Sequence, residues 1–176
     1  MDHAGIDYLI SLNNFLMKEK FEFSYEQYPD DSSLTASDLD LLKKAREITK
    51  QAYAPYSNFH VGAVAKLSNG EYVSGTNQEN ASYPVGICAE RVLLGNAATL
   101  FPGKAVESIA ISYHSDSLEN NSPVSPCGMC RQALLEYEIR TESPIRVILS
   151  GLTGPVQIID SARQLLPFAF TSKQLK

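Results

Sequence analysis

Three cysteines and one glutamate have the residue types and the spacing to do chemistry in this sequence. Cys127 and Cys130 are separated by two residues, and Cys88 lies well upstream of them. Cys88 and Cys127 each stand at the expected start of a helix, where free backbone N–H groups and the helix dipole stabilise thiolates. Three protein ligands with no obvious fourth are typical of a catalytic zinc ion, whose open position holds a water.

Glu90 follows Cys88 by two residues, so its side chain could reach past the metal without binding it. A carboxylate beside such a water can take its proton and deliver it to a substrate, which typically contributes roughly 10²- to 10⁴-fold in rate. Zinc with three thiolates carries a net negative charge. Arg91 is the candidate to offset that charge, by donating hydrogen bonds to the ligand sulfurs.

Other readings of these residues stay open at this point. A lone Cys-x-x-Cys can be redox-active, but a thiol-redox protein leaves Cys88-Ala89-Glu90 unexplained. A non-catalytic module stabilised by zinc would need a fourth ligand and no Glu90. His60 is a weak candidate for that ligand, because it alternates with the apolar face of an expected strand. The two cysteine segments together match the pattern of zinc deaminases, with Cys in place of the usual first His.

Composition limits the function classes. The chain has 176 residues, 44% of them hydrophobic, which fits a single domain over residues 1–176. The net charge of −5, without a run of Lys or Arg, argues against nucleic acid as a partner and against base editing of RNA or DNA. No apolar stretch is long enough to span a membrane. An odd cysteine count without a secretory signal predicts a reducing, cytoplasmic location.

The pattern of the chain predicts helices that alternate with strands, and therefore a mixed sheet covered on its faces. Only a short turn, the five residues 151–155, lies between the last two strands, so they should pair antiparallel. The expected helices span residues 5–20, 38–52, 87–100 and 127–138, with Ser37 as the N-cap of the second. The expected strands span 20–26, 61–67, 71–77, 108–113, 145–149 and 156–159, and Asn69-Gly70 suggests a type I′ turn within the hairpin.

The sequence resembles the homo-oligomeric, tetrameric cytidine deaminases from about residue 38 to 170. The matching stretches are Tyr53-Ala54-Pro55-Tyr56-Ser57, Phe59-His60-Val61-Gly62-Ala63, Asn77-Gln78-Glu79-Asn80-Ala81, Tyr83 to Arg91, Pro126-Cys127-Gly128-Met129-Cys130-Arg131-Gln132, and Leu165-Leu166-Pro167.

The resemblance implies a three-layer α-β-α fold with a mixed five-stranded sheet. It also implies one zinc ion per subunit and deamination of cytidine and 2′-deoxycytidine to uridine and 2′-deoxyuridine, in pyrimidine salvage. The active sites would lie at the boundaries of a homotetramer. Residues 1–36 depart from the family pattern as an N-terminal extension of open role, either an added strand or an oligomer contact.

The resemblance also assigns substrate-binding residues. By position, Asn77 and Glu79 would hold the ribose hydroxyls and Phe59 would pack near the base. The backbone of Ala89, together with Glu90, would contact the pyrimidine edge.

Phe170 resembles an aromatic residue that covers the site from another subunit, although Phe168 competes for that role.

The residues themselves favour a nucleoside over a nucleotide. Asn77 and Glu79 are two positions apart at a strand end, so their side chains can point the same way. A carboxylate suits hydroxyl donors and would repel a phosphate, and no Arg or Lys cluster lies near it in the sequence. An aminonucleoside-antibiotic deaminase of the blasticidin-S kind shares the metal motifs and remains the alternative.

Overall fold

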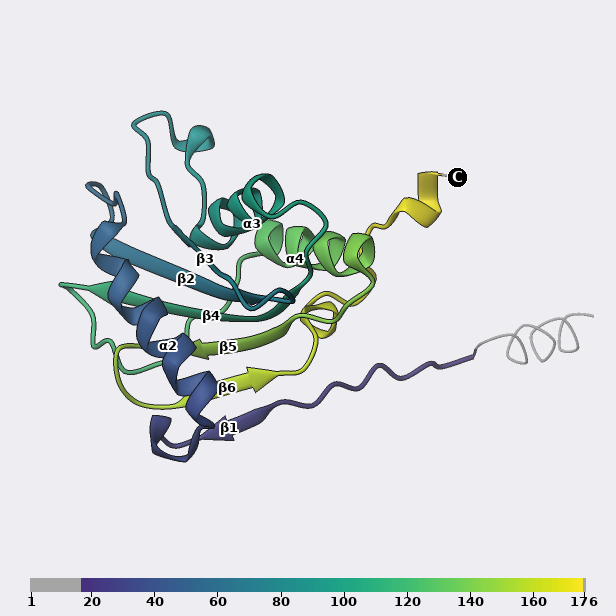
Figure 1. Cartoon of the computed structure of the whole chain (residues 1–176), viewed down its shortest axis with the longest axis horizontal. Coiled ribbons are helices and arrows are strands. Elements are labelled where there is room, and N and C mark those ends of the chain that lie inside the picture. The colour runs from purple at the N-terminus through teal and green to yellow at the C-terminus, as the bar shows by residue number, and fades with distance from the viewer. Residues whose placement is uncertain (1–16, 176) are drawn as a thin grey trace, which may run out of the picture.

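The structure is a computed structural model that describes residues 17–175. Along the chain, strands and helices are mixed, and short 3-10 turns such as Asp31–Ser33 and Tyr83–Val85 join some of them (Figure 1). The strands are β1 (Glu26–Tyr28), β2 (Phe59–Leu67), β3 (Tyr72–Thr76), β4 (Val106–Ser115), β5 (Arg146–Ser150) and β6 (Val156–Ile159). The helices are α2 (Ala36–Ile48), α3 (Ala89–Leu100) and α4 (Gly128–Thr141). In this part of the chain, no helix combines the length and the hydropathy needed to cross a membrane.

The strands form one mixed sheet in the order β1-β6-β5-β4-β2-β3. Only β4 and β5 run parallel among the described pairs, and β5 with β6 is antiparallel as the sequence predicted. The sheet has six strands, one more than the family resemblance implied. The sixth strand is β1, which pairs antiparallel with the outer edge of β6 and places Gln27 opposite Gln157.

Helices cover both faces of the sheet, which confirms the three-layer α-β-α arrangement. Helix α2 lies on one face, and α3 and α4 lie side by side on the other (Figure 1). Each face has its own apolar core because strand side chains alternate between faces. Under α2, Leu42 packs with Val64 and Ile148. Under α3 and α4, the larger core contains Leu93 and Leu134.

The hairpin between β2 and β3 forms where it was predicted, but its turn differs. A type I′ turn needs positive φ at both Asn69 and Gly70, whereas only Gly70 of this pair has it, at 87°. The Gly70 N–H donates to the Leu67 carbonyl, and the Leu67 N–H donates to the Glu71 carbonyl. The loop is therefore one residue longer, with a glycine where the left-handed conformation is required.

The N-terminal part of the chain differs most from expectation. The helix predicted over residues 5–20 lies largely outside the described residues, and 17–20 are not helical. The strand predicted over 20–26 is displaced, because pairing begins only at Glu26. Helix α2 begins earlier than predicted: the Thr35 side chain, not Ser37, accepts from the Asp38 N–H as the N-cap.

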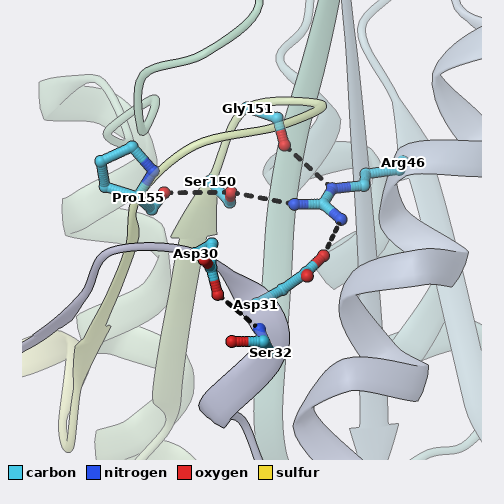
Figure 2. A network of polar contacts seen from close by, with 7 residues as sticks. All are labelled: Asp30, Asp31, Ser32, Arg46, Ser150, Gly151 and Pro155. Carbon is cyan, nitrogen blue, oxygen red and sulfur yellow. Dashed lines mark hydrogen bonds and ion pairs between the residues drawn. The ribbon is translucent and has the colours of Figure 1, made fainter.

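An arginine in α2 fixes the segment that follows β1 to the body of the protein. Asp30 caps the short turn after β1 by accepting from the Ser32 N–H, and Asp31 pairs with Arg46. The same guanidinium donates from Nε to the Gly151 carbonyl at 3.0 Å and contacts the Ser150 hydroxyl (Figure 2). The extension is thus joined to α2 and to the end of β5.

Candidate metal centre and active site

Cys88 and Cys127 are the N-cap residues of α3 and α4. An N-cap side chain usually accepts a hydrogen bond from the first turn of its helix, but neither cysteine does so here. Both sulfurs therefore stay available to a metal, close to the positive ends of two neighbouring helices. This position favours thiolates and offsets part of the negative charge that three thiolates bring to one ion.

Cys88, Cys127 and Cys130 bring their Sγ atoms to within 4.8 Å of one another. The Cys88 and Cys127 sulfurs are 3.8 Å apart, and those of Cys127 and Cys130 are 3.5 Å apart. Tetrahedral zinc with Zn–S bonds of about 2.3 Å needs sulfurs about 3.8 Å apart. The spacing is too long for a disulfide, whose sulfurs are bonded at about 2.05 Å. The cluster fits the zinc site that the sequence predicted.

The thiols of this cluster differ in acidity. The pKa of the Cys88 thiol is lowered to about 6, mainly by a hydrogen bond from Cys130, with a smaller contribution from the positive charge of Arg91. The pKa of Cys130 is raised because it gives that hydrogen bond and is buried. Arg91 thus favours a thiolate at Cys88.

Glu90 lies in the first turn of α3, only 4% exposed. Burial is the main cause of a raised pKa at its carboxyl group. A carboxyl group held away from water and beside the sulfur cluster is suited to take up and release a proton. Ala89, which precedes it, is completely buried, and strand β3 approaches it closely at Gly75.

Asn77 and Glu79 follow β3 and both point back toward the start of β2. The Asn77 side chain accepts from the Val61 N–H at 2.7 Å and donates to the Phe59 carbonyl at 2.8 Å. It therefore extends the sheet with its own amide, a role that the sequence did not reveal. The oxygen and the amino group of the Asn77 side chain can each form one further hydrogen bond.

Ser57 and Tyr56 hold the Glu79 carboxylate, and sequence reasoning had given neither a role. The Ser57 hydroxyl donates to Oε1, while the backbone N–H groups of Tyr56 and Ser57 donate to Oε2. These bonds, led by the one from the Ser57 hydroxyl, lower the pKa of Glu79. The carboxylate is thus charged at neutral pH and fixed in one orientation.

A hollow of about 190 Å³ connects these residues to the metal cluster. Asn77 and Glu79 line it together with Cys88, and aromatic rings from Tyr56 and Tyr83 complete its wall. A larger hollow lies beside the C-terminal end of α4, and no cysteine lines it. The hollow beside the cysteines is the candidate substrate site.

The aromatic residues of the site are placed differently. Phe59 stacks on Tyr113, with ring centroids 4.7 Å apart, so its ring is fixed from one side. Phe168 is fully exposed and has a φ of 55°. Phe170 is also exposed, but its carbonyl accepts a hydrogen bond from the Gln132 amide at 2.8 Å. His60 is not part of the sulfur cluster and lies instead beside His114 of β4.

Comparisons with known proteins agree with this site. Residues 35–143 match the family described as "Cytidine and deoxycytidylate deaminase zinc-binding region". The chain is similar to a cytidine deaminase from Halalkalibacterium halodurans, with 38% identity over 77% of this chain and 95% of that protein. A crystal structure of a cytidine deaminase from Burkholderia pseudomallei superposes with a TM-score of 0.65 and 37% identity, over 78% of this chain and all of that one.

A blasticidin-S deaminase from Bacillus cereus is more distant, at 27% identity over 79% of this chain and 96% of that protein. The family match covers α2, both cysteine segments and Glu90, and begins after β1. This chain therefore belongs to the cytidine and deoxycytidylate deaminase zinc-binding family.

Proposed function

We propose that this protein catalyses the hydrolytic deamination of cytidine and 2′-deoxycytidine to uridine and 2′-deoxyuridine, with release of ammonia. The observation that carries the proposal is a buried Glu90 directly beside three sulfurs spaced for zinc. A structural zinc site does not require a buried carboxyl group with a raised pKa, whereas a site that transfers protons does. The reaction would serve pyrimidine salvage, since its substrate is a free nucleoside.

Zinc held by Cys88, Cys127 and Cys130 would supply a hydroxide nucleophile near neutral pH. Glu90 takes up the proton that water gives up and delivers it to N3 of the base, so that C4 can accept the new oxygen. The same carboxylate then takes the proton of the new C4 hydroxyl group, which becomes the carbonyl of the product, and passes it to the amino group. The C4–N bond breaks, and ammonia leaves. Burial of Glu90 favours this exchange because its raised pKa brings the proton affinities of donor and acceptor closer together.

The hollow beside the cysteines would hold the nucleoside. Glu79 and Asn77 would bind the ribose hydroxyls with their remaining hydrogen-bonding capacity, and Phe59 would pack near the base. The Ala89 backbone would contact the pyrimidine edge. The fixed negative charge of Glu79 favours an uncharged ribose over a phosphorylated one, because a phosphate held close to it would be repelled.

A homotetramer with sites at its subunit boundaries is part of the proposal. Apolar side chains next to the site are exposed in the single chain: Tyr83 by 79%, Val85 by 62% and Met129 by 63%. Exposed apolar groups gathered beside a site favour a protein contact there. Phe170, or Phe168, would then cover the site of a neighbouring subunit. A cytoplasmic location would keep the three free thiols reduced.

One assay tests the function against its alternative. Purified protein is given cytidine, 2′-deoxycytidine or blasticidin S, and the deaminated product and bound zinc are measured together. We expect one zinc per chain and conversion of both pyrimidine nucleosides. Efficient turnover of blasticidin S without turnover of cytidine would contradict the proposal and favour the antibiotic deaminase.

The variant Glu90→Gln separates an enzyme from a zinc-stabilised module. It should keep its zinc and lose at least about 10²-fold in kcat, because the amide cannot carry the proton. Substantial activity in this variant would remove Glu90 from the mechanism. Light scattering on the wild type tests the homotetramer.

A further inference from the structure

Arg131 follows the last of the three cysteines and reaches two distant parts of the backbone. Its side chain runs back toward the beginning of α4, the usual direction for a helical side chain. There Nε donates to the Pro126 carbonyl at 2.9 Å, and Nη1 donates to the Leu165 carbonyl at 3.1 Å. One side chain thus joins the turn before Cys127 to the segment that leads to the C-terminus.

Of the three cysteines, Cys127 has the least packing around it. Cys130 is buried and Cys88 is half-buried, whereas Cys127 is exposed. Neighbouring side chains therefore do little to hold the Cys127 residue in place. The direction of its Cα–Cβ bond is set by the backbone, which enters Cys127 with a φ of −68°.

The Pro126 carbonyl belongs to the rigid peptide plane that ends at the Cα of Cys127. A hydrogen bond that fixes this carbonyl also restricts rotation of the plane, and with it the position of the Cys127 sulfur. The bond from Arg131 is charge-assisted, and such bonds are roughly twice as strong as those between neutral groups. Pro126 is itself buried, so water could not readily replace the arginine as a hydrogen-bond donor to its carbonyl.

We propose that Arg131 is a positioning residue for the metal centre, acting on the Cys127 ligand through the Pro126 carbonyl. The proposal rests on the zinc site described above. It assigns no contact between Arg131 and the metal or the substrate. The second bond, to Leu165, anchors the guanidinium, because a side chain held at two points keeps its direction better than one held at a single point.

The geometry explains why this position suits arginine. Two carbonyls from residues far apart in the sequence need two donors at fixed directions, and the planar guanidinium supplies them. A lysine has one ammonium group on a flexible stem, so it can serve one of these carbonyls well but not both. Arg131→Lys should therefore retain the charge and lose part of the effect.

Zinc affinity is the readout that tests the proposal, measured by competition with a chromogenic chelator. Arg131→Ala should bind zinc about 10- to 100-fold more weakly, the usual effect of removing a partner that orients a ligand. Arg131→Lys should lie between this variant and the wild type. Arg140→Ala is the matched control, because Arg140 lies on the same helix but packs over the Tyr137 ring. It should bind zinc like the wild type.

Circular dichroism of the zinc-loaded proteins separates positioning from general unfolding. Weaker zinc binding by Arg131→Lys, in a protein with the wild-type spectrum, would support the proposal even if Arg131→Ala fails to fold. Wild-type zinc affinity in either Arg131 variant would overturn it, as would an equal loss in Arg140→Ala. The assay uses no nucleoside, so a failure to deaminate cytidine would count against the proposed function alone.

Discussion

Gly75 of β3 lies so close to Ala89 that a Cβ atom on the glycine would stand 2.4 Å from the Ala89 carbonyl oxygen. It would also stand 2.4 Å from the Leu93 backbone nitrogen. Backbone therefore meets backbone where α3 begins, with no side chain that could move aside. This contact sets the distance from the sheet to the turn that carries Cys88 and Glu90.

Gly75→Ala should therefore disturb both stability and catalysis. The added methyl group must push α3 away from β3. Overpacking of this kind typically lowers the free energy of unfolding by about 1–3 kcal/mol, and we expect a loss in that range. Glu90 would move with the helix, so kcat should fall as well. Denaturant unfolding and steady-state kinetics measure the two effects.

Gly95→Ala is the control for that change. Gly95 lies within α3, and a Cβ atom there meets no heavy atom within 4 Å. Alanine in a helix interior is more favourable than glycine by roughly 0.5–1 kcal/mol, so this variant should be slightly more stable and fully active. If both variants behaved alike, the close contact at Gly75 would have no special effect.

Asn77→Ala and Glu79→Gln should separate sheet formation from substrate binding. Asn77→Ala leaves the Val61 N–H and the Phe59 carbonyl without their partner, which should cost about 1–3 kcal/mol in stability and also raise KM. Glu79→Gln keeps the shape of a partly exposed side chain and removes its charge. It should raise KM for cytidine and cost less stability than Asn77→Ala, because its amide oxygen can still accept from the Tyr56 and Ser57 N–H groups.

Kinetics and thermal unfolding of these two variants give the comparison. An unchanged KM in Glu79→Gln would contradict the assignment of Glu79 to the ribose. Unchanged stability in Asn77→Ala would show that the amide bonds to β2 contribute little.

Removal of the metal should make one thiol reactive. The pKa of Cys88 is lowered to about 6, mainly by the hydrogen bond from Cys130, so above that pH the metal-free protein carries a thiolate there. Alkylation by iodoacetamide should therefore rise as pH increases through about 6, well below the usual 8.5 of a cysteine. Mass spectrometry of chelator-treated protein locates the modified residue, and zinc should protect it. A rise only near pH 8.5 would contradict the lowered pKa.

The N-terminal strand should protect the edge of the sheet. A chain lacking residues 1–29 has no β1, so the outer backbone groups of β6 become free to pair with another chain. Light scattering should show larger, concentration-dependent species, while zinc content stays unchanged. Asp31→Asn breaks the pairing with Arg46 but keeps β1, and it should not aggregate. A truncated chain of unchanged size would show that β1 does not serve this purpose.

The sequence predicts the metal centre well because local rules decide most of it. The cysteines at the helix starts indicate which residues bind the metal and where their side chains point. The glutamate two residues beyond the first cysteine indicates the proton carrier. The roles of Ser57 and Arg131 could not be predicted in this way. Each depends on partners far along the chain, Glu79 and Leu165, that only the folded backbone brings near.

The same distinction explains the fold. Strand β6 appears where its apolar pattern and flanking turn place it, but β1 is only three residues long and largely exposed. Its aromatic neighbours have the alternation of a strand, yet pairing begins only at Glu26, opposite Ile158. β6 ends one residue later, at Ile159, so the same register would carry Phe21 and Phe23 beyond the end of β6. Pairing partners, more than the local pattern, decided where this strand begins.

The place of β1 in the sheet also affects the order in which the molecule can form. Gln27 bonds with Gln157, 130 residues later in the chain. β1 is synthesised before the other described strands but can pair only after β6 has been synthesised. Closing so long a loop is slow compared with forming the contacts between α3 and β3. The cysteine turns can be in place before the outer edge of the sheet is closed, so β1 is added to a catalytic body already built.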